Sequence, residues 1–364
     1  MKSRRWILAL DVGGTNMTAG LFHDEVGEPL VLRSRSTPVA EGVGAVVARG
    51  VALLDEVRKE AEGAGVPPDR IVGAGIGVPG AVDPTRGIVS RAPNLAWNDV
   101  PIRDRFQEAL GLPVVVDNDA NCAALGEWWA GAGRGSRLMV GATLGTGIGG
   151  GIVREGRVLR GVTGSAGEIG HMTIQLDGRS CSCGNRGCLE AYASGTAIAQ
   201  RAREALEEQR IRHREGGDPN RAGRPDDVDS PLPDHVGSTL SEDAGSILDS
   251  MVDGRWEELT AAHVSRAAGA GDELARAIMA ETARYLGAGL AGLVNVLNPD
   301  RIVLTGGVAL AGDLLLEPVR RHVRRQAFPS AAEACVIALA RSPEGAGVRG
   351  AALTFRREVL EGHR

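Results

Sequence analysis

The chain contains little lysine and few aromatic side chains. Aromatic residues make up 3% of its 364 residues, so a folded core must be built from aliphatic side chains. Neither of its two lysines, Lys2 and Lys59, lies in a glycine-rich segment. This placement excludes a P-loop lysine and a Schiff-base lysine as the basis of function.

Long apolar segments and basic stripes are also missing. The apolar run after the basic N-terminal residues covers residues 6–10, which is shorter than the ~7–15 residues of a secretory signal core. No segment reaches the ~18 apolar residues that span a bilayer. The net charge is −5, which argues against nucleic acid as a partner. We therefore expect a cytoplasmic protein with no nucleic-acid or membrane partner.

Glycine is in excess. The 52 glycines are about twice the usual ~7% share, and they cluster at expected turns, where positive φ or close backbone approach favours glycine. A chain of this length predicts two domains. Strands and helices alternate throughout, which predicts an α/β fold with mixed sheets.

Two similar strand–glycine–strand units lie about 130 residues apart, over residues 5–22 and 137–159. They suggest two related halves that face a cleft. Helical spacing of apolar residues predicts helices over 41–62, over 190–210 and from about 255 to 297. Residues 212–234 have almost no apolar side chains, so we expect an exposed, mobile insertion there.

Two glycine loops match the pattern G-x-G-x-x-G, at residues 75–80 and 145–150. A dinucleotide site would require a helix to begin in such a loop. The segment GIVREGRVL after Gly150 predicts a strand, and Pro79 interrupts the other loop. We therefore interpret 145–150 as a hairpin whose backbone N–H groups bind phosphate. In the segment DVGGTN, Asp11 can hold Mg²⁺ directly or through water, or it can simply cap a tight hairpin.

Three of the five cysteines lie in the segment CSCGNRGC, ten residues after a histidine. Three thiolates and one imidazole complete a tetrahedral zinc shell, and four protein ligands leave no open position, so the site would be structural. Three free thiols are the alternative, since disulfides are not expected in the cytoplasm. The loop is too polar to fold by burial, so the metal would supply its folding energy. The expected ligands are His171, Cys181, Cys183 and Cys188.

Together these motifs resemble those of the ROK family of repressors, open reading frames and kinases, with bacterial ROK glucokinases as the best match. The resemblance covers nearly the whole chain and rests on segments that occur in the family's order: LDVGGTNMTAGLF, GVPGAVD, APNLAWNDVP, VDNDANCAALGE, LGTGIGGGIV, GSAGEIGH, CSCGNRGCLEAYAS and IVLTGGV.

The resemblance implies an actin-like ATPase (ribonuclease H-like) fold, with two α/β domains and a central cleft. The smaller domain would comprise residues 1–117 and a C-terminal helix at about 345–364, and the larger one residues 118–344. The implied reaction transfers the γ-phosphoryl group of ATP, with Mg²⁺, to glucose and yields glucose 6-phosphate. A homodimer or homotetramer is expected.

The resemblance also implies roles for individual residues. Asp119 matches the catalytic base, although it could instead cap the helix that follows it. The implied sugar-binding residues are Asn94, Asn118, Asp119, Glu168, His171 and Glu190. The implied phosphate and nucleotide residues are Asp11, Gly13, Gly14, Thr15, Asn16, Gly145, Thr146, Gly147, Gly306 and Gly307.

The resemblance further implies that His171 serves both zinc and sugar. An imidazole has two nitrogens, so if zinc takes one, the other N–H can donate to the sugar. Glu168 and Glu190 could instead be ordinary acidic residues on the surface, with no role in sugar binding.

Other functions fit parts of the pattern. A ROK repressor would carry a helix-turn-helix domain before the first hairpin, and here the first strand is expected by Trp6, so we expect no such domain. A non-catalytic sugar sensor is a second alternative. A third is a kinase for N-acetylmannosamine, N-acetylglucosamine, fructose or mannose. Polyphosphate could also replace ATP as the phosphoryl donor.

Overall fold

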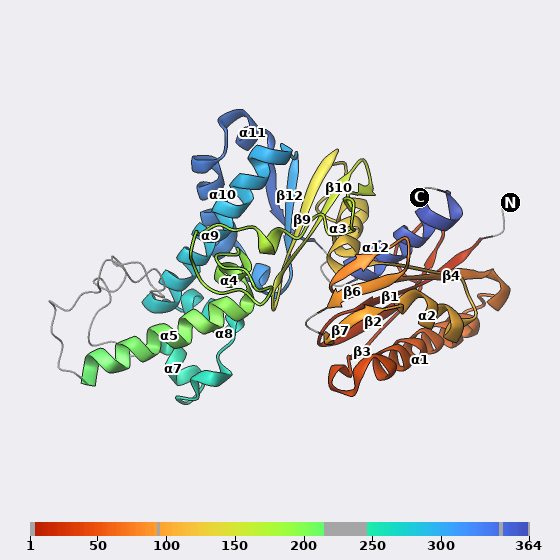
Figure 1. The fold of residues 1–364 in the computed structure, drawn as a ribbon, viewed down its shortest axis with the longest axis horizontal. Coiled ribbons are helices and arrows are strands. Elements are labelled where there is room, and N and C mark those ends of the chain that lie inside the picture. The colour runs from red at the N-terminus through yellow and green to blue at the C-terminus, as the bar shows by residue number, and fades with distance from the viewer. Residues whose placement is uncertain (1–3, 93–94, 215–245, 342–344, 363–364) are drawn as a thin grey trace.

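The computed structural model describes residues 4–92, 95–214, 246–341 and 345–362. Figure 1 shows an elongated molecule in which the N-terminal strands lie in one lobe, together with the C-terminal helix α12, and helices α5 and α8–α11 lie in the other. No helix within the described ranges is long and apolar enough to cross a membrane.

The first lobe is built on a five-stranded sheet of order β3-β2-β1-β4-β8. β1 pairs antiparallel with β2 and parallel with β4, and the apolar residues of these strands are almost completely buried. The strands are β1 (Trp6–Val12), β2 (Asn16–His23), β3 (Val31–Ser36), β4 (Ile71–Val78) and β8 (Val114–Asn118).

The second lobe repeats this topology in the order β11-β10-β9-β12-β13. Again the central strand pairs antiparallel with its hairpin partner and parallel with the next strand. The expectation of two related halves is therefore confirmed. The strands are β9 (Leu138–Leu144), β10 (Ile148–Arg154), β11 (Arg157–Val158), β12 (Arg301–Thr305) and β13 (Val336–Leu339). A third, small sheet contains β5 (Ala81–Asp83), β6 (Ile88–Ala92) and β7 (Trp97–Val100).

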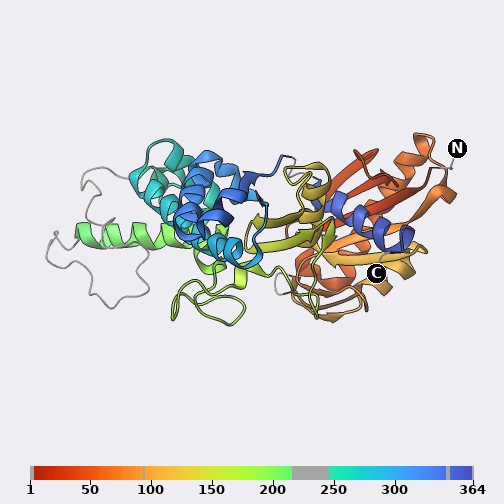
Figure 2. The same ribbon diagram turned by 90° about the horizontal axis from the view of Figure 1, so that it is seen from above.

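Helices cover these sheets (Figure 2). Those of the first lobe and the junction are α1 (Gly42–Gly63), α2 (Ile102–Leu110), α3 (Asp119–Ala130) and α12 (Ala346–Phe355). Those of the second lobe are α4 (Glu190–Ala193), α5 (Gly195–Arg214), α7 (Ile247–Met251), α8 (Ala261–Gly269), α9 (Glu273–Leu297), α10 (Asp313–Gln326) and α11 (Pro329–Ala334).

The helix expected from about 255 to 297 is in fact broken. α8 ends at Gly269 and α9 begins after Asp272, whose carboxylate accepts the N–H of Ala275 at 2.8 Å. A side-chain cap at this point satisfies a backbone donor that a continuous helix would satisfy internally. Of the expected 212–234 insertion, residues 212–214 form the end of α5, and the rest lies outside the described residues.

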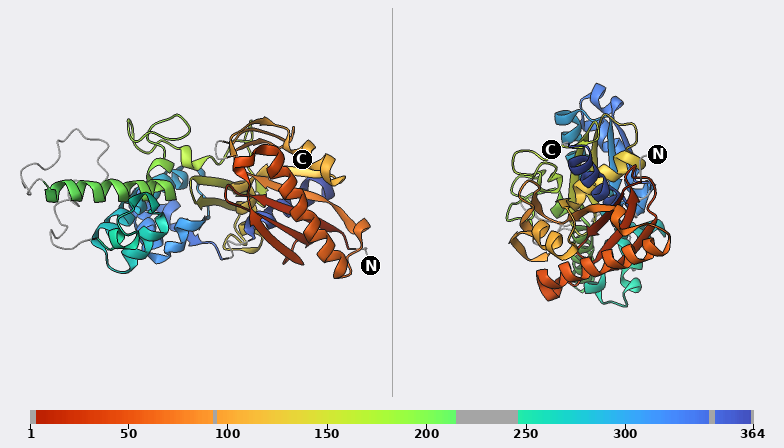
Figure 3. Two further views of the ribbon diagram at one scale, coloured as in Figure 1. Left: turned by 90° about the horizontal axis from the view of Figure 1, so that it is seen from below. Right: turned by 90° about the vertical axis from the view of Figure 1, so that its right-hand side faces the viewer.

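The middle layer between the two sheets consists of α3 and α12. A single buried cluster joins β1 residues such as Ile7 to Leu125 of α3, Met139 of β9 and Leu353 of α12. In Figure 3 the C-terminal helix lies against the N-terminal lobe. We keep the division of the chain into 1–117 with 345–364, and 118–344, as a proposal, because α3 packs against α12 and also against β9 and β10.

α3 and α12 cross at glycines. A Cβ on Gly350 of α12 would collide with the carbonyl of Cys122, and a Cβ on Gly126 of α3 would collide with the carbonyl of Ala346. We predict that Gly350→Ala forces the helices apart and destabilises the fold by about 1–3 kcal/mol, the usual cost of overpacking. Thermal unfolding should show a lower Tm. Gly63→Ala, at a helical position with open space around it, should leave the Tm unchanged or raised.

Candidate functional site

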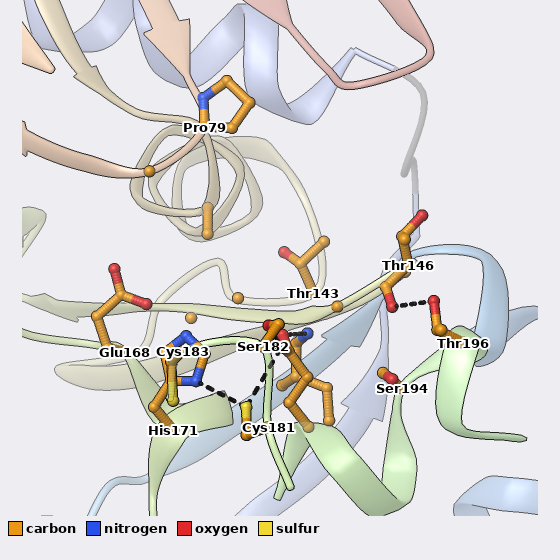
Figure 4. A pocket seen from close by; sticks show the side chains of 18 of the residues that line it. Pro79, Thr143, Thr146, Glu168, His171, Cys181, Ser182, Cys183, Ser194 and Thr196 are labelled. Carbon is orange, nitrogen blue, oxygen red and sulfur yellow. Dashed lines mark hydrogen bonds between the residues drawn. The ribbon is translucent and has the colours of Figure 1, made fainter. Parts of the chain in front are cut away.

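A cleft of about 1360 Å³ opens between the two lobes (Figure 4). It exceeds the ~300–1,000 Å³ of a typical single-ligand pocket, so two substrates fit side by side. Segments of both lobes line it: Gly13–Thr15, Pro79–Ala81, Asn118–Asn121, Gly145–Gly150, Gly164–Ala166, Glu168, His171, Arg179–Cys183, Glu190 and, from α5, Thr196, Gln200 and Glu204.

The first hairpin turn, between β1 and β2, faces this cleft. Its N–H at Gly13 donates to the carbonyl of Asn16 at 2.9 Å, and the Thr37 hydroxyl donates to the carbonyl of Gly13 at 2.7 Å. A side chain at Gly13 would collide with that Asn16 carbonyl, so the turn requires glycine. Gly13, Gly14 and Thr15 line the cleft as the phosphate-loop hypothesis requires, whereas Asn16 does not.

The second hairpin turn, between β9 and β10, faces the first across the cleft. A strand follows it, so the rejection of a dinucleotide fingerprint at 145–150 is confirmed. The turn is held from outside by α5, because Gly195 N–H donates to the carbonyl of Gly145 at 2.7 Å and the Thr196 hydroxyl donates to the carbonyl of Thr146 at 2.8 Å. Both hairpins therefore present backbone to the cleft.

Gly306 and Gly307 do not line this cleft. A Cβ on Gly306 would lie against the carbonyl of Leu144, so this glycine permits close packing of the chain on β9. Its φ of +90° also favours glycine. The proposed place of the pair near the nucleotide remains a prediction.

Asp119 lies at the start of α3, on the wall of the cleft. The helix is capped by Asn118 instead, whose side-chain oxygen accepts the N–H of Asn121 at 3.0 Å. The interpretation of Asp119 as the cap is therefore wrong. One Asp119 oxygen, Oδ1, accepts the N–H of Ala120 at 2.9 Å. Because the capping role is filled, the carboxylate of Asp119 is available for chemistry.

Two carboxyl groups at or near the cleft have raised pKa values. Burial raises the pKa of Asp119 to about 6, and the negative charge of Glu168 adds to the effect. Burial and the charge of Asp119 raise the pKa of Asp11 to about 7. Both acids are partly exposed, and Asp119 lines the cleft, whereas Asp11 does not. A pKa near the working pH is what a general base requires.

Three of the residues assigned to the sugar, Glu168, His171 and Glu190, gather on another wall of the cleft, while Asn118 and Asp119 lie at the start of α3. Glu168 and His171 lie side by side in Figure 4, next to the cysteine loop. Glu190 does not point freely into the cleft: its Oε2 accepts the N–H of Ile148 at 2.8 Å and its Oε1 accepts from the Ser182 hydroxyl at 3.2 Å. It therefore ties the cysteine loop to the second hairpin. Asn94 lies outside the described residues.

The four expected metal ligands form one cluster, with their ligand atoms all within 4.8 Å of one another. Cys181 Sγ lies 3.7 Å from His171 Nδ1, and Cys183 Sγ lies 3.7 Å from Cys188 Sγ. In a tetrahedral site with Zn–S near ~2.3 Å the sulfurs are about 3.8 Å apart. The geometry therefore fits a zinc ion, and it leaves Nε2 of His171 as the nitrogen that faces away from the cysteines.

Sequence reasoning missed the part of the cleft that α5 forms. Thr196, Gln200 and Glu204 recur every four residues on one helix face, which was a detectable signal. Glu204 pairs with Arg179 at 2.6 Å and accepts from Gln200 at 2.8 Å. This polar face extends the cleft wall beyond the cysteine loop.

Comparison with known proteins identifies the family of this chain. A family model described as the ROK family matches residues 7–358. The chain belongs to the ROK family. The resemblance predicted from its motifs is thereby confirmed, and so is the actin-like ATPase fold, which the solved ROK structures share.

Individual ROK proteins are similar over most of their length. The glucokinase of Halalkalibacterium halodurans is 38% identical over 349 residues, 96% of this chain and 94% of its own. A ROK family glucokinase from Streptomyces griseus, solved in complex with glucose and AMPPNP, has a TM-score of 0.73 and 32% identity, covering 96% of this chain and 98% of that one. A putative xylose repressor of a Caldicellulosiruptor species is 34% identical, covering 88% of this chain and 71% of that protein.

Proposed function

We propose that this ROK protein is an ATP-dependent glucokinase that transfers the γ-phosphoryl group of ATP to the 6-hydroxyl of glucose. The observation that carries the proposal is the position of Asp119. Its carboxylate lies in one cleft with two backbone hairpins suited to phosphate and with a polar wall suited to a polyol. The similarity to two bacterial glucokinases supports glucose as the acceptor.

The chemistry requires positioning and charge neutralisation more than covalent work. The N–H groups of Gly13 and Gly145 donate within their own turns, so the N–H groups that would hold phosphate oxygens are those of Gly14 and Thr15 in the first turn and of Thr146 and Gly147 in the second. Asn118, Glu168 and His171 offer both donors and acceptors to sugar hydroxyls. Asp119 accepts the proton of the attacking hydroxyl as the new P–O bond forms, and the pKa raised by burial makes it a stronger base than an exposed aspartate.

Two metal ions belong to the proposal. Mg²⁺ bound with ATP neutralises phosphate charge, and Asp11 at the end of β1 is the residue that would hold it, directly or through water. Zn²⁺ would be held by His171, Cys181, Cys183 and Cys188 and would be structural, because four protein ligands complete its shell. Nδ1 of His171 lies 3.7 Å from Cys181 Sγ, so it would be the zinc ligand, and Nε2 would then be able to donate to the sugar.

A coupled assay of ADP release tests the function over a panel of glucose, mannose, fructose, N-acetylglucosamine and N-acetylmannosamine. We expect the highest kcat/KM with glucose and ATP. Preference for an amino sugar would reassign the substrate, and turnover with polyphosphate but not ATP would reassign the donor. Absence of turnover with every sugar and donor would contradict the kinase and favour a sugar sensor, a possibility raised by the similarity to a putative xylose repressor.

The pH dependence of kcat/KM for glucose gives a separate prediction. Asp119 must be ionised to accept a proton, and burial raises its pKa to about 6. Activity should therefore fall as the pH is lowered through about 6, by up to about tenfold per unit below it. Rate measurements at saturating MgATP between pH 5 and 8 test this. A rate that stays constant from pH 8 down to pH 5, as an exposed aspartate with a pKa near ~4 would give, would contradict it.

We also expect a homodimer or homotetramer, which light scattering coupled to gel filtration would measure.

A further inference from the structure

Arg160 joins three segments of the chain close to Asp119, the proposed base. Its Nε and Nη2 both donate to Oδ2 of Asp117, at 3.0 and 2.7 Å, and Nη2 also donates to Glu358 at 2.7 Å. Asp117 lies near the end of β8, two residues before Asp119, and Glu358 lies in the C-terminal turn Arg356–Leu360. Asp117 is 2% exposed, so this is a buried carboxylate with a dedicated cation.

The other oxygen of Asp117 organises the backbone that carries the proposed base. Its Oδ1 accepts the N–H of Asn118 at 2.8 Å and the side-chain amide of Asn121 at 3.1 Å. Asn118 in turn caps α3 and donates to the carbonyl of Gly80 at 2.9 Å. Asp117 therefore fixes the residues on either side of Asp119, and Arg160 fixes Asp117.

The main chain of Arg160 holds the sugar side of the same cleft. Its carbonyl accepts the N–H of Ala166 at 3.0 Å, which closes the loop that leads to Glu168. Arg160 itself does not line the cleft, whereas Gly164, Ala166 and Glu168 do. Arg160 thus contacts the segment before Asp119 through its side chain and the segment before Glu168 through its carbonyl, without lining the cleft itself.

The positive charge of Arg160 balances the buried negative charge of Asp117, so a neutral side chain cannot take its place. Burial lowers the pKa of Arg160, but the charge and hydrogen bonds of Asp117 and the charge of Glu358 outweigh it and raise that pKa above its usual value. Removing one partner of a buried pair leaves an uncompensated charge. The uncompensated Asp117 carboxylate would then turn toward other donors or water and release Asn118.

We propose that Arg160 is a positioning residue for phosphoryl transfer: through its ion pair with Asp117 it holds Asp119 in line with the sugar hydroxyl. This inference rests on the proposed base role of Asp119. A misplacement of about 1 Å in an active site can cost ~10²-fold in rate, so a residue that does not touch substrate can still control kcat.

The first test compares Arg160→Gln with Arg160→Lys and with Arg157→Gln, a matched change at an exposed arginine on the same strand-to-loop segment. We expect Arg160→Gln to lower kcat about 10- to 100-fold, with the KM for ATP within twofold of wild type. Arg160→Lys keeps a cation but loses the fork of donors, so it should recover part of that loss. Arg157→Gln should match wild type.

A double-mutant cycle decides whether Arg160 acts through Asp117. In an Asp117→Asn background the carboxylate charge is gone, so adding Arg160→Gln should lower kcat less than threefold further. An equal loss in both backgrounds would overturn the proposal. It would also be overturned if Arg160→Gln lowers the Tm but leaves the kcat of folded enzyme unchanged, because the role would then be structural.

Wild-type turnover separates this inference from the proposed function. If wild type phosphorylates no sugar, the proposed function itself fails. If wild type is active and the cycle is additive, the positioning role of Arg160 alone fails. Circular dichroism of each variant before the assay ensures that kcat refers to folded protein.

Discussion

Asp119→Asn is expected to lower kcat for glucose phosphorylation by about 10²- to 10⁴-fold, the usual contribution of a general base. Asparagine keeps the size of the side chain and can still accept the N–H of Ala120 through its oxygen. What it loses is the capacity to take a proton. Sugar affinity should be roughly kept, so fluorescence or calorimetric titration with glucose should give a Kd near that of wild type.

The fold should tolerate this substitution. The pKa of Asp119 is raised in the fold to about 6 from an ordinary value of 3.8, so above pH 6 its ionised form costs stability that falls away as the pH is lowered. Replacing it by a neutral amide removes that cost, and the Tm at pH 7 should be equal to or higher than that of wild type.

Asp313→Asn is the matched control for this experiment. It removes an acid from the first position of another helix, α10, at an exposed site outside the cleft, and should leave kcat unchanged. If Asp119→Asn retains more than a tenth of wild-type kcat, the base assignment is refuted.

Features that depend on residues close in sequence could be predicted. The two glycine hairpins follow from alternating apolar residues on both sides of a turn, and the structure has them at β1–β2 and β9–β10. The zinc ligands from His171 to Cys188 lie within 18 residues, so their spacing already constrained the geometry that the structure shows. Both cases rest on local backbone chemistry.

Features that join distant segments gave no such signal. Arg160 pairs with Asp117 across 43 residues and with Glu358 across 198. The sequence around these three residues does not predict that they contact one another. The crossing of α12 over α3 at Gly350 depends on a contact that a single sequence does not reveal. Asn118 and Asp119 are both good capping residues, and only the backbone geometry decides that Asn118 is the cap.

The cysteine loop is anchored at its ends by buried residues, and between them it is held by backbone hydrogen bonds with little burial. Cys188 and Leu189 are fully buried, and Leu189 N–H donates to the carbonyl of Met172 at 2.9 Å. Between these anchors the chain from Ser180 to Arg186 is mostly exposed and polar. A metal ion bound to the four ligands would therefore supply the order that burial does not.

Cys183→Ser is expected to lose zinc and to weaken sugar binding about 10- to 100-fold, as the loss of one or two hydrogen bonds would produce. Without the metal, the His171 ring beside Glu168 would lose one support, and a disordered loop would weaken the hydrogen bond from Ser182 to Glu190. The ATP site should change less, because the turn at Gly145–Gly147 is also held by Gly195 and Thr196 of α5. Elemental analysis, glucose titration and nucleotide titration measure the three effects.

Cys335→Ser is the matched control, since Cys335 is a partly buried cysteine outside the cluster. It should keep one zinc per chain and wild-type affinity for both substrates. Both variants should retain wild-type secondary structure by circular dichroism, because the buried cores of the two lobes do not depend on the exposed part of the loop. Wild-type protein purified without chelator and found free of zinc would reject the metal site. A zinc-free Cys183→Ser variant with unchanged glucose affinity would leave the metal site intact as an assignment but would reject its coupling to sugar binding. The positions of Glu168 and His171 would then not depend on the metal.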